Sequence, residues 1–167
     1  MKNKILMGGL TIVIMSLIIA CNQKKEGTPT TTTSVDKDQI KAELQVLETA
    51  FAEAMNLRST ASIVYYADDA TSFAQNKSPL IGKAAIDKSI MEENAAIPKG
   101  SKVSYTANEV FPSINGNQVV EIGSYQVVDS TGAVKSNGNY MSLFEKRDGK
   151  YVCIRDMSAS IMPIEKK

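Results

Sequence analysis

The residue types that could carry out chemistry in this chain are limited, because its 167 residues include no histidine. Histidine is the commonest general base at neutral pH and the commonest metal ligand in proteins. Acid–base chemistry would therefore depend on carboxylates, tyrosines or lysines. We accordingly expect neither a metal site nor a bound cofactor.

Cysteine is also scarce, with one residue at position 21 and another at position 153. Cys153 lies between Val152 and Ile154 in a strand-like run, and a thiolate nucleophile there would lack its usual histidine base. We therefore expect Cys153 to be a core residue rather than a catalytic one.

The leading candidate for a chemical role is Asp156, near the end of the chain. Asp148-Gly149 predicts a two-residue hairpin turn that pairs Arg147 with Lys150. Counting back from this turn, one face of the hairpin carries Leu143 beside Ile154, Met141 beside Asp156, and Asn139 beside Ser158. This face is apolar near the turn and polar farther away, so we assign it to the wall of a pocket. A one-residue bulge would exchange the two faces.

Within an apolar enclosure the pKa of Asp156 would rise, and its carboxylate would be suited to accept a proton from a carbon acid. The alternative is a structural ion pair with Arg155, Arg58 or a lysine at the rim. A second carboxylate, Glu121, lies in an otherwise apolar strand, and the alternation with Val120 and Ile122 places it on the solvent side.

The elements that would position these residues begin with helices. Apolar residues at helical spacing predict a long amphipathic helix, and Asp36 with Gln39 has the form of a capping box at its start. The stripe consists of Ile40, Leu44, Leu47, Phe51 and Met55, with Glu48 on another face. A shorter helix over residues 60–67, capped by Ser59, is predicted to end at Asp68-Asp69, and a brief strand over 71–74 follows. A third helix is expected over 83–96.

From residue 102 the apolar pattern changes to a period of two. Four strands are predicted, over 102–111, 118–129, 138–147 and 150–160, separated by turns rich in glycine and asparagine. The predicted class is α+β, with three N-terminal helices packed in the concavity of a curved, mainly antiparallel sheet. Such an arrangement leaves a pocket between the helices and the sheet.

The N-terminus has the pattern of a bacterial lipoprotein. Residues 1–20 combine a basic start with an apolar run, as in a signal peptide, and Ile18-Ile19-Ala20-Cys21 resembles the lipobox in which the cysteine is lipidated after cleavage. A retained anchor and an ordinary signal peptide are the alternatives. We expect a lipidated Cys21 with a Thr-rich tether over 21–35, a domain over 36–162 and a tail over 163–167. Because residue 22 is not aspartate, outer-membrane delivery within the cell envelope is favoured.

Charge excludes one class of partner. The 19 basic and 18 acidic residues nearly balance, and no basic stripe is interleaved with aromatic residues. We expect no nucleic-acid binding.

Taken in order, several motifs resemble the nuclear transport factor 2-like superfamily, the cone-shaped fold shared with ketosteroid isomerases and SnoaL-like cyclases. They are "AELQVLETAFAEAMNLRSTASIVYYADDATSF", "PLIGKAAI" and "GNYMSLFEKRDGKYVCIRDMSAS", and the resemblance covers residues 39–160. It departs from the family pattern at Ser158, where relatives often carry tryptophan.

The resemblance implies that Tyr66 and Asp69 border the pocket, with Tyr66 able to donate a hydrogen bond to an oxyanion. Alternatively, Tyr66 packs its ring and Asp69 ends a helix. It also implies a homodimer formed through the sheet, for which Tyr140, Phe144 and Met157 would supply an apolar patch.

Two functions remain open at this point. One is a binding module that holds a small apolar molecule or a protein partner. The other is an isomerase, cyclase or dehydratase with Asp156 as the base and Tyr66 as the donor. We prefer the binding module, because such an enzyme needs a base and an oxyanion hole in one cavity, and the sequence offers no evident second donor.

Overall fold

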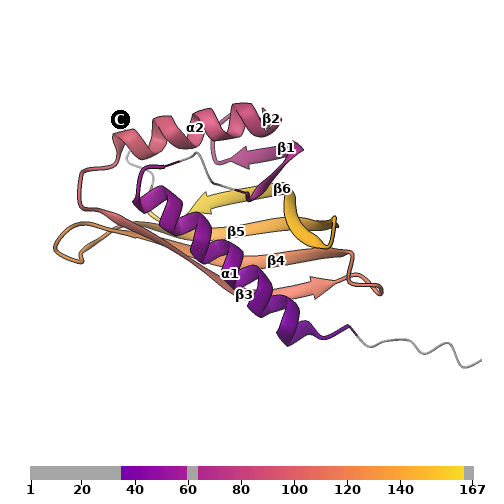
Figure 1. Ribbon diagram of the computed structural model, residues 1–167. Coiled ribbons are helices and arrows are strands. Elements are labelled where there is room, and N and C mark those ends of the chain that lie inside the picture. Colours follow the sequence, from indigo (N-terminus) through magenta and orange to yellow (C-terminus); the bar gives the residue numbers. More distant parts are fainter. Residues whose placement is uncertain (1–34, 60–63, 164–167) are drawn as a thin grey trace, which may run out of the picture. The chain divides into compact units, whose positions relative to one another are not determined.

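A curved sheet of six strands carries two helices on its concave face in the computed structural model, which describes residues 35–59 and 64–163 (Figure 1). The elements are α1 (Lys37–Asn56), β1 (Tyr66–Ala74), β2 (Leu80–Ile81), α2 (Lys83–Ala96), β3 (Lys102–Pro112), β4 (Gln118–Val128), β5 (Val134–Arg147) and β6 (Lys150–Ser160). The strand order is β2-β1-β6-β5-β4-β3, and neighbouring strands are antiparallel except for the parallel pair β1 and β6. The predicted α+β class is confirmed. Among the described residues, no helix is both long and apolar enough to cross a membrane.

Helix α1 begins where the sequence predicts. The Asp36 carboxylate accepts hydrogen bonds from the backbone amides of Asp38 and Gln39, each at 3.0 Å. The capping box is only half formed, because the Gln39 side chain donates to Glu43 instead of returning to the helix start. The buried face of the helix consists of Ile40, Leu44, Glu48, Phe51 and Ala52.

Two polar side chains of α1 cover the edge of the sheet. The Gln45 amide accepts from the backbone N–H of Ala107 at 2.9 Å and donates to the carbonyl of Tyr105 at 3.1 Å. The Asn56 amide makes the same pair of bonds with Val103, at 2.8 and 3.0 Å. Because β3 is an edge strand, these bonds satisfy backbone groups that would otherwise be open to another chain.

The prediction of three helices is wrong for the described residues, which contain two. Residues 60–63 of the expected second helix lie outside the described residues. The remainder of that helix is not formed, since Tyr66 opens β1 and the carbonyl of Tyr65 accepts from the Cys153 amide at 2.8 Å. Pairing with β6 therefore overrides the local helix preference of this run.

The third predicted helix is confirmed as α2, over the expected residues. Its C-terminal end is tied to that of α1, because the Asn94 side chain donates to the Met55 carbonyl at 2.7 Å. The Arg58 guanidinium donates in turn to the carbonyls of Asn94 and Ile97, at 3.1 and 2.8 Å. Arg58 thus joins the two helices and is not the ion-pair partner of Asp156.

The four predicted strands of the meander are confirmed, although β5 begins at Val134 rather than at residue 138. Asp148 and Gly149 both adopt positive φ angles, of 50° and 79°, as a type I′ hairpin turn requires. Arg147 pairs with Lys150 as predicted.

A bulge in this last hairpin alters the predicted faces. The register shifts after Phe144, which pairs with Cys153, so that Leu143 pairs with Arg155 and Ile154 is the additional residue. As a result, Ser142 lies opposite Asp156. The one-residue bulge considered in the sequence analysis is therefore present, and it exchanges the faces of β5 relative to β6.

Three assignments on β5 are corrected by this bulge. Met141 is 44% exposed on the outer face, whereas Tyr140 and Phe144 are buried beneath the helices. The outer face therefore keeps only Met157 of the predicted dimerisation patch, together with Phe73 and Met141 around a shallow apolar hollow.

Candidate functional site

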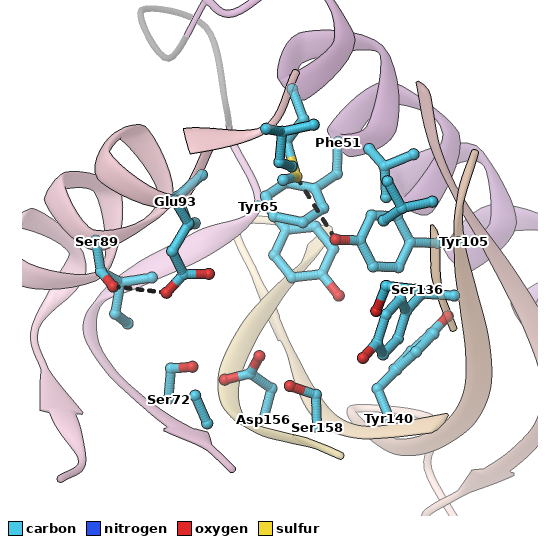
Figure 2. A pocket seen from close by; sticks show the side chains of 18 of the residues that line it. Phe51, Tyr65, Ser72, Ser89, Glu93, Tyr105, Ser136, Tyr140, Asp156 and Ser158 are labelled. Carbon is cyan, nitrogen blue, oxygen red and sulfur yellow. Dashed lines mark hydrogen bonds between the residues drawn. The ribbon is translucent and has the colours of Figure 1, made fainter. Parts of the chain in front are cut away.

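A cavity of about 510 Å³ lies between the two helices and the concave face of the sheet. Its sheet side carries Ser72 from β1 and Asp156 and Ser158 from β6. Figure 2 shows these three side chains next to one another, below the rings of Phe51 and Tyr65. The site therefore combines a polar floor with an aromatic wall, as ligand pockets commonly do.

Aromatic rings in mutual contact form one part of the cavity lining, and aliphatic side chains such as Leu80, Ile86 and Ile90 form another. Phe51 stacks on Tyr65 with ring centroids 4.5 Å apart, and Tyr66 meets Tyr65 edge to face at 4.8 Å. Tyr105 lies 5.4 Å from Phe51 and 5.9 Å from Tyr140. These stacked, tilted and edge-to-face pairs are favourable geometries that hold the rings in place.

Glu48 is the most unusual member of the wall, since it is a carboxylic acid on the buried face of α1 with 1% exposure. The Tyr65 hydroxyl donates to it at 2.5 Å. Burial raises the pKa of Glu48 from 4.5 to about 8, the charges of Glu121 and Asp156 add to the rise, and the Tyr65 hydrogen bond opposes it. Glu48 is therefore protonated at neutral pH and able to donate a hydrogen bond.

Asp156 lines the cavity and is held by the parallel strand β1. The Tyr66 hydroxyl donates to its Oδ2 at 3.1 Å, while its buried Oδ1 has no hydrogen-bond partner among the described residues. Burial raises the pKa of Asp156, and the nearby Ser72 and Tyr66 hydroxyls partly offset the rise. Asp156 and Tyr66 thus lie together at the cavity, as the sequence analysis expected, and their chemical roles stay predictions.

A third carboxyl group lies beneath the cavity wall. Glu121 of β4 is fully buried, and the Tyr140 hydroxyl donates to its Oε1 at 2.6 Å. A Cβ at Gly123 would overlap the Tyr140 ring, so glycine leaves the room that the ring needs to reach Glu121. Burial raises the pKa of Glu121. The expectation that Glu121 faces solvent is therefore wrong.

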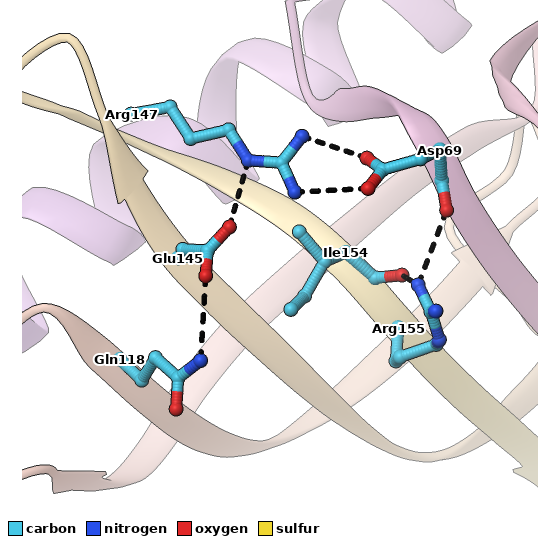
Figure 3. A network of polar contacts seen from close by, with 6 residues as sticks. All are labelled: Asp69, Gln118, Glu145, Arg147, Ile154 and Arg155. Atoms are coloured by element: carbon cyan, nitrogen blue, oxygen red, sulfur yellow. Dashed lines mark hydrogen bonds and ion pairs between the residues drawn. The ribbon is translucent and has the colours of Figure 1, made fainter.

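Three of the predicted pocket residues lie away from the cavity: Asp69, Asn139 and Met141. The bulge in the last hairpin directs Asn139 and Met141 to the outer face. The pairing of β1 with β6 is irregular between Tyr66 and Thr71, and this turns Asp69 to the surface. There its carboxylate forms a two-pronged ion pair with Arg147, at 2.7 and 3.1 Å (Figure 3).

Glu48 was not predicted to line the cavity and Glu121 was predicted on the wrong face, although the sequence pattern indicates the burial of both. Glu48 falls four residues after Leu44 and three before Phe51, so it lies on the apolar stripe of α1. Glu121 alternates with Val119 and Gly123, all three buried on one side of β4. A carboxylate on an apolar face is rare without a partner, and here the partners are tyrosines distant in sequence.

In the described part of the chain, no three Asp, Glu or Cys side chains cluster in a way that could hold a metal ion. Cys153 is fully buried, which confirms it as a core residue, and burial raises the pKa of its thiol. A thiol in this state is a poor nucleophile.

Comparison with known proteins identifies the fold and no closer relationship. No family model matches the chain, and no curated protein matches it significantly in sequence. Among solved structures, a Nostoc punctiforme protein of unknown function with a cystatin-like fold is similar at a TM-score of 0.63 and 12% identity, covering 75% of this chain and 93% of the other.

Two further structures carry more specific names. A nuclear transport factor 2-like protein with a cystatin-like fold from Novosphingobium aromaticivorans has a TM-score of 0.61 at 12% identity, covering 76% and 85% of the two chains. A ketosteroid isomerase-like protein from Erwinia carotovora atroseptica has a TM-score of 0.53 at 16% identity, covering 75% and 99%. The chain therefore has the nuclear transport factor 2-like fold that its motifs resemble.

Proposed function

We propose that this protein is a lipid-anchored envelope protein whose domain binds a small, largely apolar molecule. The observation that carries the proposal is the cavity of about 510 Å³, walled by aromatic rings and provided with a few polar groups. A volume of this size suits one small organic molecule. The largely apolar wall would bury its body, and Asp156 and the protonated Glu48 would orient it.

Native mass spectrometry of the chain over residues 21–167, carrying Cys21→Ser so that it stays soluble without acyl chains, tests the binding function. We expect a discrete added mass when the protein is purified gently from its own host. A protein that is empty under these conditions and binds none of a panel of small aromatic compounds would contradict the proposal.

The lipid anchor rests on the sequence Ile18-Ile19-Ala20-Cys21. Cells fed an alkyne analogue of palmitate should label the wild-type protein and the Cys153→Ser control, both in the outer-membrane fraction. Cys21→Ser should lose the label and leave the membrane. Equal labelling of Cys21→Ser would refute lipidation at this residue.

Acid–base catalysis is the second candidate, and one observation favours it. Asp156 lines the cavity with one carboxyl oxygen that has no hydrogen-bond partner among the described residues, and Glu48 supplies a protonated carboxyl in the same cavity. The fold is also that of a ketosteroid isomerase-like protein. In this scheme Asp156 would move a proton from the α-carbon to the γ-carbon of a β,γ-unsaturated ketone, with the intermediate enolate held by the Glu48 hydroxyl.

The ultraviolet absorbance of the conjugated product reads out this reaction. If the protein is such an enzyme, Asp156→Asn should abolish turnover while the circular dichroism spectrum and the binding of the ketone are retained. Turnover that survives Asp156→Asn would exclude Asp156 as the base.

A homodimer is the partner we propose for the outer face of the sheet. Phe73, Met141 and Met157 are 42%, 44% and 56% exposed and line one apolar hollow there, so a second copy would bury them. Sedimentation should show a dimer that Met157→Lys converts to a monomer. A wild-type monomer at high micromolar concentration would remove this proposal.

A further inference from the structure

We propose that the ligand of this cavity carries a cationic amino group on an apolar body, an inference that rests on the binding function proposed above. The observations are a set of carboxyl groups without a basic partner, placed inside an aromatic enclosure. Each is independent of the similarity to other proteins.

The first observation is an unused acceptor. Asp156 Oδ1 is buried and has no hydrogen-bond partner among the described residues, and Tyr66 occupies only the other oxygen. Glu48 lines the same cavity, and Glu121 lies under Tyr140 in its wall. A buried carboxyl oxygen without a partner is costly, so a ligand that donates to the cavity-lining carboxyl group of Asp156 would relieve that cost.

The second observation is the lack of an internal cation. Of the described residues that line the cavity, Lys135 alone has a basic side chain. The side chain of Lys135 is 59% exposed and forms an ion pair at 3.0 Å with Asp129, a residue that does not line the cavity. The guanidinium groups of Arg147 and Arg155 bind Asp69 on the surface. Glu93 also lines the cavity and pairs with Lys77 at 2.6 Å, whereas Asp156 forms no ion pair among the described residues. A cationic ligand would supply the positive charge that balances an ionised Asp156.

The third observation is the ring composition of the wall. Phe51, Tyr65, Tyr66 and Tyr105 all line the cavity. Faces of aromatic rings attract a cation through their quadrupole, most strongly where water is excluded. The same faces repel an anion, as the carboxylates do. Rings and carboxyl groups together therefore select a protonated amine over an acid of similar shape.

Three probes of similar shape and different charge test this inference: phenethylamine, phenethyl alcohol and hydrocinnamate. The protein is the isotopically labelled chain over residues 21–167 with Cys21→Ser, and binding is followed by NMR shifts of cavity residues. We expect the amine to bind about tenfold or more tightly than the alcohol, and the acid most weakly.

Asp156→Asn separates charge recognition from simple occupancy. It should lower the affinity for the amine much more than the affinity for the alcohol, so that the two become about equal, because the neutral amide cannot pair with the cation. The dispersion of the NMR spectrum reports that the variant is folded. Glu92→Gln, which alters a carboxylate with 68% side-chain exposure on α2, is the matched control and should change nothing.

The outcomes distinguish this inference from the binding function beneath it. Alcohol or acid binding as tightly as the amine, or an amine affinity unaffected by Asp156→Asn, would overturn the cation preference and leave the cavity function standing. If none of the three probes shifts the cavity resonances, both proposals fail.

Discussion

Two sets of carboxyl groups in this domain have pKa values that are shifted in opposite directions. Glu48, Glu121 and Asp156 lie in or behind the cavity wall, and burial raises the pKa of each. Asp69 and Glu145 lie on the surface, and hydrogen bonds from Arg147 hold the pKa of each below its usual value (Figure 3). The residue type is the same, so solvent and partner decide the charge.

The partners differ as much as the burial. Each of the three carboxyl groups of raised pKa accepts from a neutral tyrosine hydroxyl, namely Tyr65, Tyr66 or Tyr140. On the surface, Arg147 also donates through Nε to Glu145 at 2.8 Å. Tyrosine satisfies an acceptor without supplying charge. The cavity therefore keeps carboxyl groups that can take up or release protons, whereas the surface network is fully ionised.

The largest change in the free energy of unfolding should follow from Glu48→Gln. Between pH 4.5 and about 8 the unfolded chain loses this proton while the folded chain keeps it, so stability falls as pH rises. Glutamine does not ionise and can still accept from Tyr65. At about pH 8 the variant should be more stable than the wild type by roughly 3–5 kcal/mol.

Urea denaturation at mildly acidic and mildly alkaline pH measures this difference. At the acidic end the variant and the wild type should be nearly equal, and the exposed-site variant Glu92→Gln should follow the wild type throughout. A Glu48→Gln protein with the wild-type pH dependence would show that Glu48 is ionised in the folded state.

Tyr140→Phe should have an intermediate effect. It removes the hydroxyl that donates to Glu121, whose Oε2 already has no hydrogen-bond partner among the described residues. We expect a loss of about 1–3 kcal/mol in the free energy of unfolding. Calorimetry of Tyr125→Phe provides the control, because the Tyr125 hydroxyl donates to no carboxyl group of the described residues, and an equal loss there would argue against the Glu121 bond.

The smallest effect should come from Asp69→Asn on the surface. Because the folded pKa of Asp69 is lowered, its contribution is present above the ordinary value of 3.8 and lost as the pH falls through the folded value. Thermal unfolding should shift by no more than about 2 °C at low salt and not at all at high salt. A large shift that persists at high salt would contradict the weak stabilisation expected of this surface ion pair, compared with the large effects expected at the buried carboxyl groups.

Much of the fold was predictable because its signals are local. The Asp36 cap, the apolar stripe of α1, the whole of α2 and the Asp148-Gly149 turn depend on neighbouring residues and were predicted correctly. The helix predicted over residues 60–67 is wrong for the described residues 64–67. Tyr66 belongs to a strand there because it pairs with Cys153, which lies far along the chain. Local preference is decisive only where no distant strand competes for the backbone.

The site was predictable only in part, for a related reason. Asp156 was correctly placed at a pocket wall, but the assignment of Asn139 and Met141 beside it was wrong, because a bulge at Ile154 shifts the register by one residue. A period-two pattern tells which residues share a face of one strand and not how two strands align around a bulge.

What the sequence by itself determined is the long helix α1, the helix α2, the four strands of the meander and the absence of histidine from any site. These follow from short-range backbone preferences and from composition. Only the tertiary structure decided that Glu48, Glu121 and Asp156 come together behind aromatic rings and lose their contact with water. The pKa of a carboxyl group depends on solvent and charge within a few ångströms, and that neighbourhood exists only after distant segments have packed.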